Sequence, residues 1–324
     1  GIICIVFFLF SVLPGDAAQM TMGQRADVQS LESVRKELGL DKSKGLQFLY
    51  FVNDISPIGI HPADATTQAK YHYLPILKIS SSQVLVLKRP YLRRSYQTKR
   101  EVSDILAETI PNTLVLAFGS MVFATIIGLS LGILAALKQH TWIDKLAIGV
   151  SIIGISAPSF YVLNRYTGLN MTGSLFNYDP FNGQVLSLQN LVLPLLTLGL
   201  RPLAIIVQLT RSSMLDVLNQ DYIRTARAKG LSERQVIYKH ALKNALNPVL
   251  TAVSGWFASL MAGSFFVEYI FGYNGLGKAT VDALEMSDFP VVMGSILFIA
   301  VIFVLINLLV DVLYGFLDPR VSIN

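Results

Sequence analysis

Long apolar runs separated by polar blocks dominate the chain. Each run is interrupted mainly by Gly, Ser or Pro, which transmembrane helices tolerate. An α-helix needs about 20 apolar residues to cross roughly 30 Å of bilayer hydrocarbon. The main apolar runs occupy approximately residues 111–137, 144–163, 188–212, 245–267 and 290–316. The pattern predicts an all-α, polytopic membrane protein.

Two shorter apolar runs need a separate interpretation. Residues 1–13 are apolar but too short to span the bilayer alone, and they lack the basic start and small-residue cleavage site of a signal peptide. We interpret them as the C-terminal part of a first transmembrane helix, which brings the predicted spans to six. The run at 144–163 is also short, because Asn164 and Arg165 soon follow Phe160. Either this helix ends early or residues are missing near 160–164.

The distribution of Lys and Arg among the short loops predicts the orientation, because cytoplasmic loops carry the excess of these residues. The loops between spans three and four and between spans five and six offer only Arg165 and Lys278, so we expect them outside. Alternation then places the C-terminal tail inside and the long block 14–103 outside. The loop after the fourth span is expected in the cytoplasm because it carries Arg211, Arg224, Arg227, Lys229, Arg234, Lys239 and Lys243.

Local patterns divide the chain further. Within the external block, residues 28–38 predict a short amphipathic helix and residues 83–87 a strand. Residues 102–110 predict a separate amphipathic helix at the membrane interface, with Pro111 at the turn into the next span. The expected parts are a first-helix remnant at 1–13, an external segment at 14–103, and a transmembrane core at 104–324 with a cytoplasmic loop at 216–244.

Composition narrows the functional classes. The chain is 52% hydrophobic and only 15% charged, which is unlike a soluble domain. Its net charge of +5 has a topological explanation and does not indicate nucleic-acid binding. The single cysteine, Cys4, excludes an intrachain disulfide, and the four histidines lack ligand spacing, so no metal site is expected.

The cytoplasmic loop contains a helix, a break and a second helix. Gly230 suits the left-handed residue that ends a helix, and Ser232 with Gln235 fits the capping box that begins the next one. A DNA-binding helix-turn-helix is disfavoured because apolar spans flank the loop on both sides. Attraction to the membrane surface would explain the basic residues. Docking onto a partner protein would also explain the placement of the glycine and the cap.

This loop resembles the cytoplasmic signature loop of ATP-binding-cassette (ABC) importer permeases, in which an E-A-A pattern precedes a Gly and a later Pro. The E-A-A positions are Arg224, Thr225 and Ala226, followed by Gly230 and Pro248. The form R-T-A-R-A-K-G is usual in the peptide/nickel subfamily. Further motifs resemble the first permease of dipeptide and oligopeptide importers: Leu13-Pro14-Gly15-Asp16, Leu38-Gly39-Leu40-Asp41, Leu209-Thr210-Arg211-Ser212-Ser213-Met214, Glu268-Tyr269-Ile270-Phe271, Gly275-Leu276-Gly277 and Leu317-Asp318-Pro319-Arg320.

The resemblance implies a type I ABC importer permease in the bacterial cytoplasmic (inner) membrane. Such a subunit forms the translocation path for di- or oligopeptides, with nickel or glutathione as alternative cargo. It catalyses nothing and binds no cofactor, because two partner ATPase subunits bind ATP and Mg. A second homologous permease and an external solute-binding protein complete the complex. The rival from another class, an ion-coupled secondary transporter, would need an acidic relay, for which Asp311 is the only candidate. The external stretch 56–97 is longer than the family pattern, and no role follows for it.

The resemblance also assigns candidate residues to the loop, which we call the coupling loop (residues 216–244, continuing to Pro248). We expect the helix at about 232–239 to contact an ATPase subunit. The assigned residues are Asp221, Tyr222, Arg224, Thr225, Ala226, Ala228, Lys229, Gly230, Leu231, Ser232, Gln235, Val236, His240, Asn244 and Pro248.

A second candidate region lies at the outer side. Residues 272–279 almost match a phosphate-binding loop, but Ala279 replaces the final Ser or Thr and no strand precedes the motif. We interpret its glycines as allowing a tight turn at an outer gate. Arg201 lies within the fourth span, where an Arg needs a polar cavity or a partner. The residues expected along the translocation path or at the gate are Arg201, Glu268, Gly275 and Gly277.

Overall fold

The computed structural model describes residues 1–12, 41–64, 67–68, 71, 73–80, 83–156, 172–173, 175–179, 181 and 183–317. The helix expected at 28–38 and the chain break expected near 160–164 lie outside these residues. Contacts divide the chain into two compact units. The first unit comprises Gly1–Thr109 and Ala279–Val301, and the second comprises Ile110–Lys278 and Ile302–Asn324. The three-part division expected from the sequence stays a prediction.

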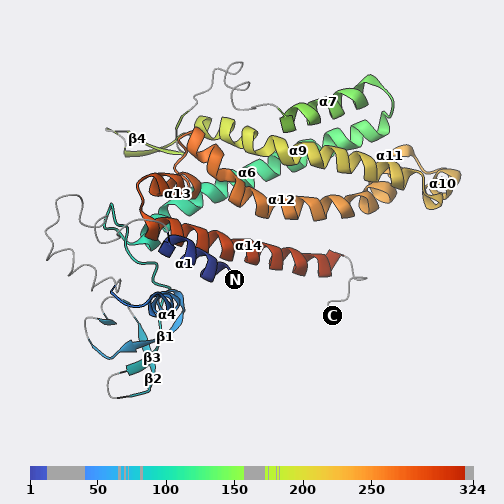
Figure 1. Ribbon diagram of the computed structural model, residues 1–324. Coiled ribbons are helices and arrows are strands. Elements are labelled where there is room, and N and C mark those ends of the chain that lie inside the picture. Colours follow the sequence, from blue (N-terminus) through green and yellow to red (C-terminus); the bar gives the residue numbers. More distant parts are fainter. Residues whose placement is uncertain are drawn as a thin grey trace. The chain divides into compact units, whose positions relative to one another are not determined.

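The first unit combines helices with a small antiparallel sheet in the order β1-β3-β2 (Figure 1). The strand expected at 83–87 is confirmed as β3, which buries Val84 and Val86 on one face. Its elements are α1 (Ile2–Val12), α4 (Lys44–Ile55), β1 (Ile58–Pro62), β2 (Leu74–Lys78), β3 (Gln83–Leu87), the start of α6 (Val102–Leu137), most of α13 (Leu276–Glu285) and the start of α14 (Phe289–Leu317).

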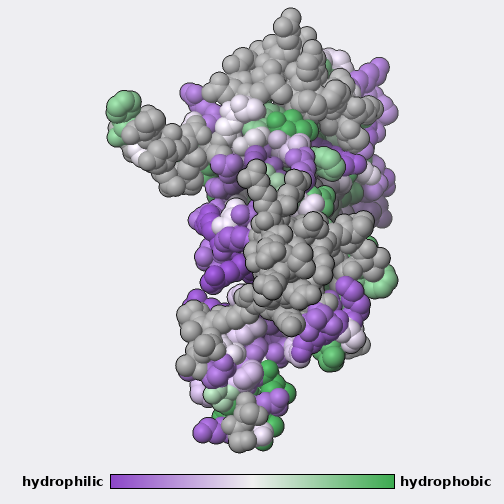
Figure 2. Space-filling model, turned by 60° about the vertical axis from the view of Figure 1, so that its left-hand side comes forward, coloured by the Kyte–Doolittle hydropathy of each residue, from purple (hydrophilic) through white to green (hydrophobic). Residues whose placement is uncertain are grey.

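The sheet leaves aliphatic side chains exposed in a row that crosses the strands. Leu87 of β3 pairs with Ile58 of β1 on one side and with Leu74 of β2 on the other, and all three are exposed. In Figure 2, hydrophobic residues in green occupy the lowest part of the view beside hydrophilic ones. The sheet therefore buries one face and presents an apolar stripe on the other.

A polar cluster ties the end of α4 to the sheet. The Tyr71 hydroxyl donates to Asp54 Oδ1 at 2.9 Å, and Lys88 Nζ donates to the Asp54 carbonyl at 2.5 Å. Burial raises the pKa of Tyr71, and the nearby Asp54 charge raises it further. Burial lowers the pKa of Lys88, while Asp54 opposes that shift. The phenol therefore stays a neutral hydrogen-bond donor at physiological pH.

Asp288 holds residues 95–98 against the loop before α14. Its carboxylate accepts hydrogen bonds from the Ser95 hydroxyl and, at 2.9 Å, from the Tyr96 backbone N–H. Ser95 and Asp288 are both buried. Because a buried carboxylate without donors is costly, these bonds fix residues 95–98 against this loop.

The second unit is a helical assembly that contains most of the long apolar runs. Three helices, α6, α9 and α14, are long and apolar enough to cross a membrane among the described residues, or four if the bent α11–α12 segment counts as one span. The count of six spans therefore stays a prediction. Besides parts of α6, α13 and α14, the unit has α7 (Trp142–Ser156), β4 (Phe176–Asp179), β5 (Gly183–Leu186), α9 (Gln189–Leu218), α10 (Asp221–Ala228), α11 (Glu233–Gln235), the π-helix η1 (Val236–Ala241) and α12 (Leu242–Ile270).

The prediction of a separate interfacial helix at 102–110 is wrong. Helix α6 continues from Val102 to Leu137 with Pro111 inside it. Val102 and Leu106 are buried, and Val102 lies against Gly294 of α14 in the first unit. Protein therefore packs against this end of the helix, and the packing sustains the helix through the proline.

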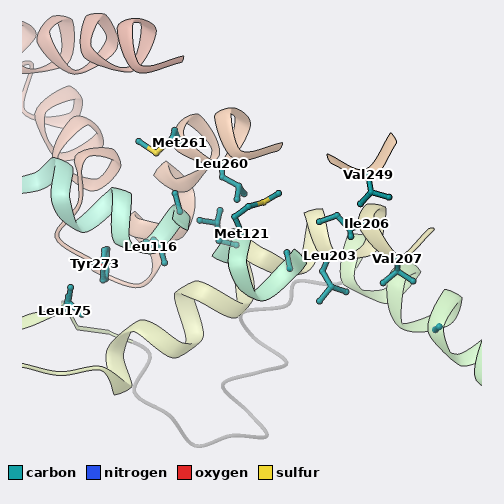
Figure 3. Packing of buried hydrophobic residues seen from close by; sticks show 14 of the residues in the cluster. Leu116, Met121, Leu175, Leu203, Ile206, Val207, Val249, Leu260, Met261 and Tyr273 are labelled. Atoms are coloured by element: carbon teal, nitrogen blue, oxygen red, sulfur yellow. The ribbon is translucent and has the colours of Figure 1, made fainter. Parts of the chain in front are cut away.

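Helices α6 and α9 approach each other closely through glycines of α6. A Cβ atom added to Gly132 would lie 2.6 Å from Thr210 Cβ and 2.8 Å from the Val207 carbonyl oxygen. A Cβ atom on Gly128 would lie 2.7 Å from Ile206 Cγ2. The spacing Gly-x-x-x-Gly is typical of close helix contacts in membranes. Ile206 and Val207 belong to the buried cluster in Figure 3, which joins α6, α9 and α12.

We expect Gly132→Ala to destabilise this unit by about 1–3 kcal/mol, because overpacking forces the two helices apart. Gly149→Ala is the matched control, since a Cβ atom on this helical glycine of α7 meets no atom within 4 Å. The control should leave stability unchanged or slightly raise it. Thermal unfolding of the detergent-solubilised protein measures both variants, and equal midpoints would contradict the close α6–α9 contact.

Candidate functional site

The coupling loop is anchored to the end of α9 by a buried cluster. Ile223 and Ala226 on one face of α10 are buried and belong to the same cluster as Met214 of α9 and Val236 of η1. The opposite face of α10 is exposed. Because α10 buries one face, this helix of the coupling loop is packed against its neighbours rather than free to move alone.

Gly230 ends α10 as expected. Its φ of +76° lies in the left-handed region, and the Leu231 N–H donates to the Ala226 carbonyl at 3.4 Å. A Cβ atom at this glycine would meet no atom within 4 Å. The cost of replacing Gly230 is therefore conformational, with no steric contribution from neighbours.

The capping box is also confirmed. Ser232 Oγ accepts a hydrogen bond from the Gln235 N–H at 3.4 Å, and Gln235 Oε1 accepts one from the Ser232 N–H at 3.2 Å. An ion pair across the turn was not expected. Arg227 Nε donates to Glu233 Oε1 at 2.9 Å, and a terminal nitrogen of Arg227 donates to Glu233 Oε2 at 3.3 Å. The two helices around Gly230 are therefore joined by a bidentate contact.

The prediction of a separate short docking helix at 232–239 is wrong in one respect. Glu233–Gln235 is α-helical, but the chain then passes through the π-helix η1 directly into α12. The Asn244 side chain donates to the Tyr222 hydroxyl at 2.8 Å, which holds the start of α12 beside α10. Because no break follows Gln235, the surface helix and the apolar α12 form one continuous element.

Most of the assigned coupling-loop residues are accessible. Ala226 and Val236 are buried, and Leu231 and His240 are half-buried. Tyr222 and Tyr238 present large exposed side chains, with 41% and 62% of their surface accessible. Such an aromatic and basic surface is typical of a protein interface. The exposed members are Asp221, Tyr222, Arg224, Thr225, Ala228, Lys229, Gly230, Ser232, Gln235, Asn244 and Pro248.

Arg211 contributes a structural contact that the sequence did not indicate. Its Nε and terminal nitrogen donate to Asp144 Oδ1 at 2.5 Å and Oδ2 at 2.8 Å. The same carboxylate accepts a hydrogen bond from the His140 N–H at 3.0 Å. The loop between α6 and α7 is thereby fixed to α9 by a bidentate ion pair. Arg211 therefore has a defined partner in addition to any topological role.

Glu268, expected along the translocation path or at the gate, is fully buried in the last turn of α12. Its Oε2 accepts hydrogen bonds from the Gly277 N–H at 2.7 Å and the Lys278 N–H at 3.2 Å. Thr113 Oγ1 of α6 donates to Glu268 Oε1 at 2.8 Å. The carboxylate is buried because the first N–H groups of α13 and a threonine satisfy it.

Residues of α12 leave no room for a side chain at either glycine expected at the gate. A Cβ atom at Gly275 would overlap Glu268 Oε2, and one at Gly277 would lie 2.5 Å from Phe265 Cα. The anion position at the start of α13 is thus occupied by the chain's own carboxylate. This contact gives a structural reason why the motif at 272–279 is not a phosphate-binding loop.

The remaining candidate, Arg201, lies in α9 and is exposed in this chain. An apolar groove of about 590 Å³ lies among α6, α12 and α14 within the second unit. Thr125 and Ser254 bring hydroxyl groups to a lining that is otherwise made of apolar side chains. A peptide would find few partners there for its backbone amides, so this groove is unsuited to peptide passage.

Two family models match the chain. The family described as "Binding-protein-dependent transport system inner membrane component" matches residues 128–323. A second model, for the N-terminal region of such membrane components, matches residues 2–59. A chain from an inward-facing structure of the MetNI methionine ABC transporter has a TM-score of 0.54 and 19% identity, covering 67% of this chain and 98% of that one. This likeness supports the fold.

Curated relatives cover almost the full length. The glutathione transport system permease protein GsiC of Shigella flexneri serotype 5b is 36% identical over 321 residues, or 99% of this chain and 94% of the relative. The dipeptide transport system permease protein DppB of Alkalihalophilus pseudofirmus is 34% identical over 347 residues, or 99% and 95% of the two chains. The chain therefore belongs to the family of binding-protein-dependent transport system inner membrane components, which are the permease subunits of ABC importers.

Proposed function

We propose that this permease carries short peptides and that its coupling loop receives the movement of partner ATPase subunits. The two relatives named above transport dipeptides and glutathione, and glutathione is itself a tripeptide. A short peptide is thus the cargo chemistry that both have in common. The observation that supports the coupling role is that the segment around Gly230 is exposed and that the Arg227–Glu233 ion pair joins its two helices.

The proposed topology has six spans, with residues 14–103 external and the coupling loop and C-terminus cytoplasmic. The excess of Lys and Arg in the coupling loop supports this orientation. The proposed complex contains a second homologous permease, two ATPase subunits that bind ATP and Mg, and an external solute-binding protein. This chain contributes no catalytic residue and no cofactor site in the proposal.

Transmission through the coupling loop would rely on rigid-body motion. Ile223 and Ala226 bury one face of α10 against the end of α9. The Arg227–Glu233 pair joins α10 to the segment that continues into α12. A displacement of the exposed surface is therefore delivered to two membrane helices together rather than absorbed within the loop.

The proposed gate is the contact between Glu268 and the start of α13. It joins residues of α6, α12 and α13 in one hydrogen-bonded group. A movement of α12 must therefore either move α6 and α13 with it or break these hydrogen bonds. Arg201 is proposed to line the path or to contact the second permease, because an exposed Arg on a membrane helix needs a polar partner.

Replacement of Gly230 should impair coupling before it impairs assembly. A left-handed conformation costs a non-glycine residue roughly 1–2 kcal/mol, so Gly230→Val should distort the turn, and Gly230→Ala should be milder. We expect reduced substrate-stimulated ATP hydrolysis and reduced transport in a complex that still assembles. Gly45→Val is the control, because this glycine has no neighbour within 4 Å and no positive φ. Transport by Gly230→Val at the wild-type rate would remove the coupling role of the turn.

Removal of the Glu268 carboxylate should loosen the gate. Glu268→Ala leaves the N–H groups of Gly277 and Lys278 without their acceptor, at a cost of about 1–3 kcal/mol, whereas Glu268→Gln retains one oxygen. Thermal unfolding of the purified complex should rank Ala below Gln below wild type. The control Glu108→Ala disrupts an exposed ion pair with Arg100 and should change stability by less than about 1 kcal/mol. Wild-type stability in Glu268→Ala would contradict the gate.

Uptake by the reconstituted complex tests the whole proposal. Proteoliposomes containing this permease, its companion permease, the ATPase subunits and the solute-binding protein should accumulate a labelled dipeptide or tripeptide only with ATP. Omission of the ATPase subunits is the control and should abolish uptake. Peptide uptake driven by an ion gradient without ATP, or uptake of nickel but not of peptides, would overturn the proposal.

A further inference from the structure

Helix α7 is joined to the second unit mainly through α9. Among the described residues, α9 is the element that α7 packs against most extensively, and the two helices run side by side in Figure 1. Asp144 and Ala147 of α7 are buried and lie three residues apart, so they share one face of the helix. Lys145 and Leu146 between them are exposed. The attachment of α7 therefore depends on a narrow face.

The apolar part of this face does not fix the position of α7 along α9. Ala147 belongs to the same buried cluster as Ile206 and Val207 of α9. A methyl group offers little resistance to small sliding movements, which are common between packed helices. The Asp144–Arg211 ion pair does fix this position. Its two N–H···O bonds, of 2.5 and 2.8 Å, require the guanidinium and the carboxylate to face each other in one orientation.

Asp144 also holds the turn that leads into α7. His140 has a φ of +63°, in the left-handed region that a non-glycine residue adopts only where its surroundings enforce it. Its N–H donates to Asp144 Oδ2 at 3.0 Å. Ala136, near the end of α6, belongs to the buried cluster that anchors the coupling loop. The same carboxylate thus connects α7, the α6–α7 turn and α9.

Arg211 lies close to the point where the coupling loop meets α9. Met214, three residues further along α9, belongs to the cluster that buries Ile223 and Ala226 of α10. A displacement of α10 therefore reaches α9 within one helical turn of the ion pair. The side chains of Arg211 and Asp144 are only 22% and 5% exposed. Such a shielded pair resists separation, because parting it would leave a buried carboxylate without its partner.

We propose that Arg211 is a positioning residue that makes α7 follow α9 when the coupling loop is displaced. The inference rests on the proposed coupling function and adds α7 to the helices that receive the movement. Without the ion pair, α9 would slide past Ala147, and the movement would reach α9 and α12 but not α7. Arg211 thus acts on transport through the position of another helix.

Spin-label distances test the proposal in the complete complex, which contains both permeases, the ATPase subunits and the solute-binding protein. The native thiol is removed by Cys4→Ser. Labels at Lys145→Cys on α7 and Gln189→Cys at the start of α9 occupy exposed positions. Gln189 lies roughly 33 Å from Arg211 along α9 at 1.5 Å per residue, so the label distance reports sliding of α7 along this helix. It is measured without nucleotide and with a non-hydrolysable ATP analogue. Peptide uptake per ATP hydrolysed is measured in proteoliposomes.

With Arg211 in place, the label distance should be the same in both states. In Arg211→Ala it should change by roughly 1–2 Å, or broaden, when the ATP analogue binds. Uptake per ATP should fall about fivefold or more. Arg211→Lys keeps the charge but not the bidentate geometry and should give an intermediate loss. Arg100→Ala is the matched control, because it breaks an exposed ion pair with Glu108 and should leave both readouts unchanged.

The double variant Asp144→Ala/Arg211→Ala removes the link without leaving a buried charge, so a folding defect of the single variant does not decide the result. It should behave like Arg211→Ala. The same label distance in both states of the double variant would overturn the proposal. A loss of uptake that follows the yield of assembled complex, with uptake per ATP unchanged, would also overturn it. Uptake by the wild type without ATP would instead remove the proposed coupling function, so the two failures are distinguishable.

Discussion

The close contact between α6 and α9 constrains the rest of the second unit. Gly132 has no room for a side chain against Thr210. The next residue of α9, Arg211, forms an ion pair with Asp144 and so holds the α6–α7 loop against α9. Met214, one turn further along, lies in the buried cluster beneath the coupling loop. Three successive features of the fold therefore depend on the register of one helix pair, so a shift of α9 along α6 would disturb all of them together.

The two ends of α12 are organised by different chemistry. At its start, the coupling loop is held by apolar burial and by short-range hydrogen bonds around Gly230 and Ser232. At its end, Glu268 is held by hydrogen bonds in a buried setting. Buried polar networks depend strongly on geometry, whereas apolar packing tolerates small shifts. The Glu268 end is thus the more sensitive of the two to a change in helix position.

Local features of the site could be predicted from the sequence. The left-handed Gly230 and the Ser232–Gln235 capping box depend on residues within a few positions of each other, so their residue types were enough. Pairs distant in the chain could not be found in this way. Asp144 and Arg211 are 67 residues apart, and Thr113 and Glu268 are 155 apart. The sequence therefore indicated Glu268 as a gate candidate without indicating its hydrogen-bond partner on α6.

The same limits apply to the fold. Hydrophobic runs located α6, α9, α12 and α14, because helices in lipid must satisfy their backbone internally and so need long apolar sequences. Pro111 was taken as a boundary because proline usually interrupts helices, but burial of Val102 and Leu106 outweighed the lost hydrogen bond. The continuity of α11, η1 and α12 was likewise hidden, because the polar composition at 233–241 suggested a separate surface helix.

Because α11, η1 and α12 are continuous, a tilt at one end of this segment moves its other end. From Glu233 to Met261 the chain is helical, and at 1.5 Å per residue it is roughly 43 Å long. A tilt of about 5° about one end would move the other end by roughly 4 Å, which exceeds the length of a hydrogen bond. Beyond Met261 the segment Gly263–Ile270 turns by 52° and carries Glu268. Glu268 lies beyond this bend, so a tilt of the long segment about its loop end would displace Glu268 by a distance comparable to a hydrogen bond, which is enough to exchange its hydrogen-bond partners.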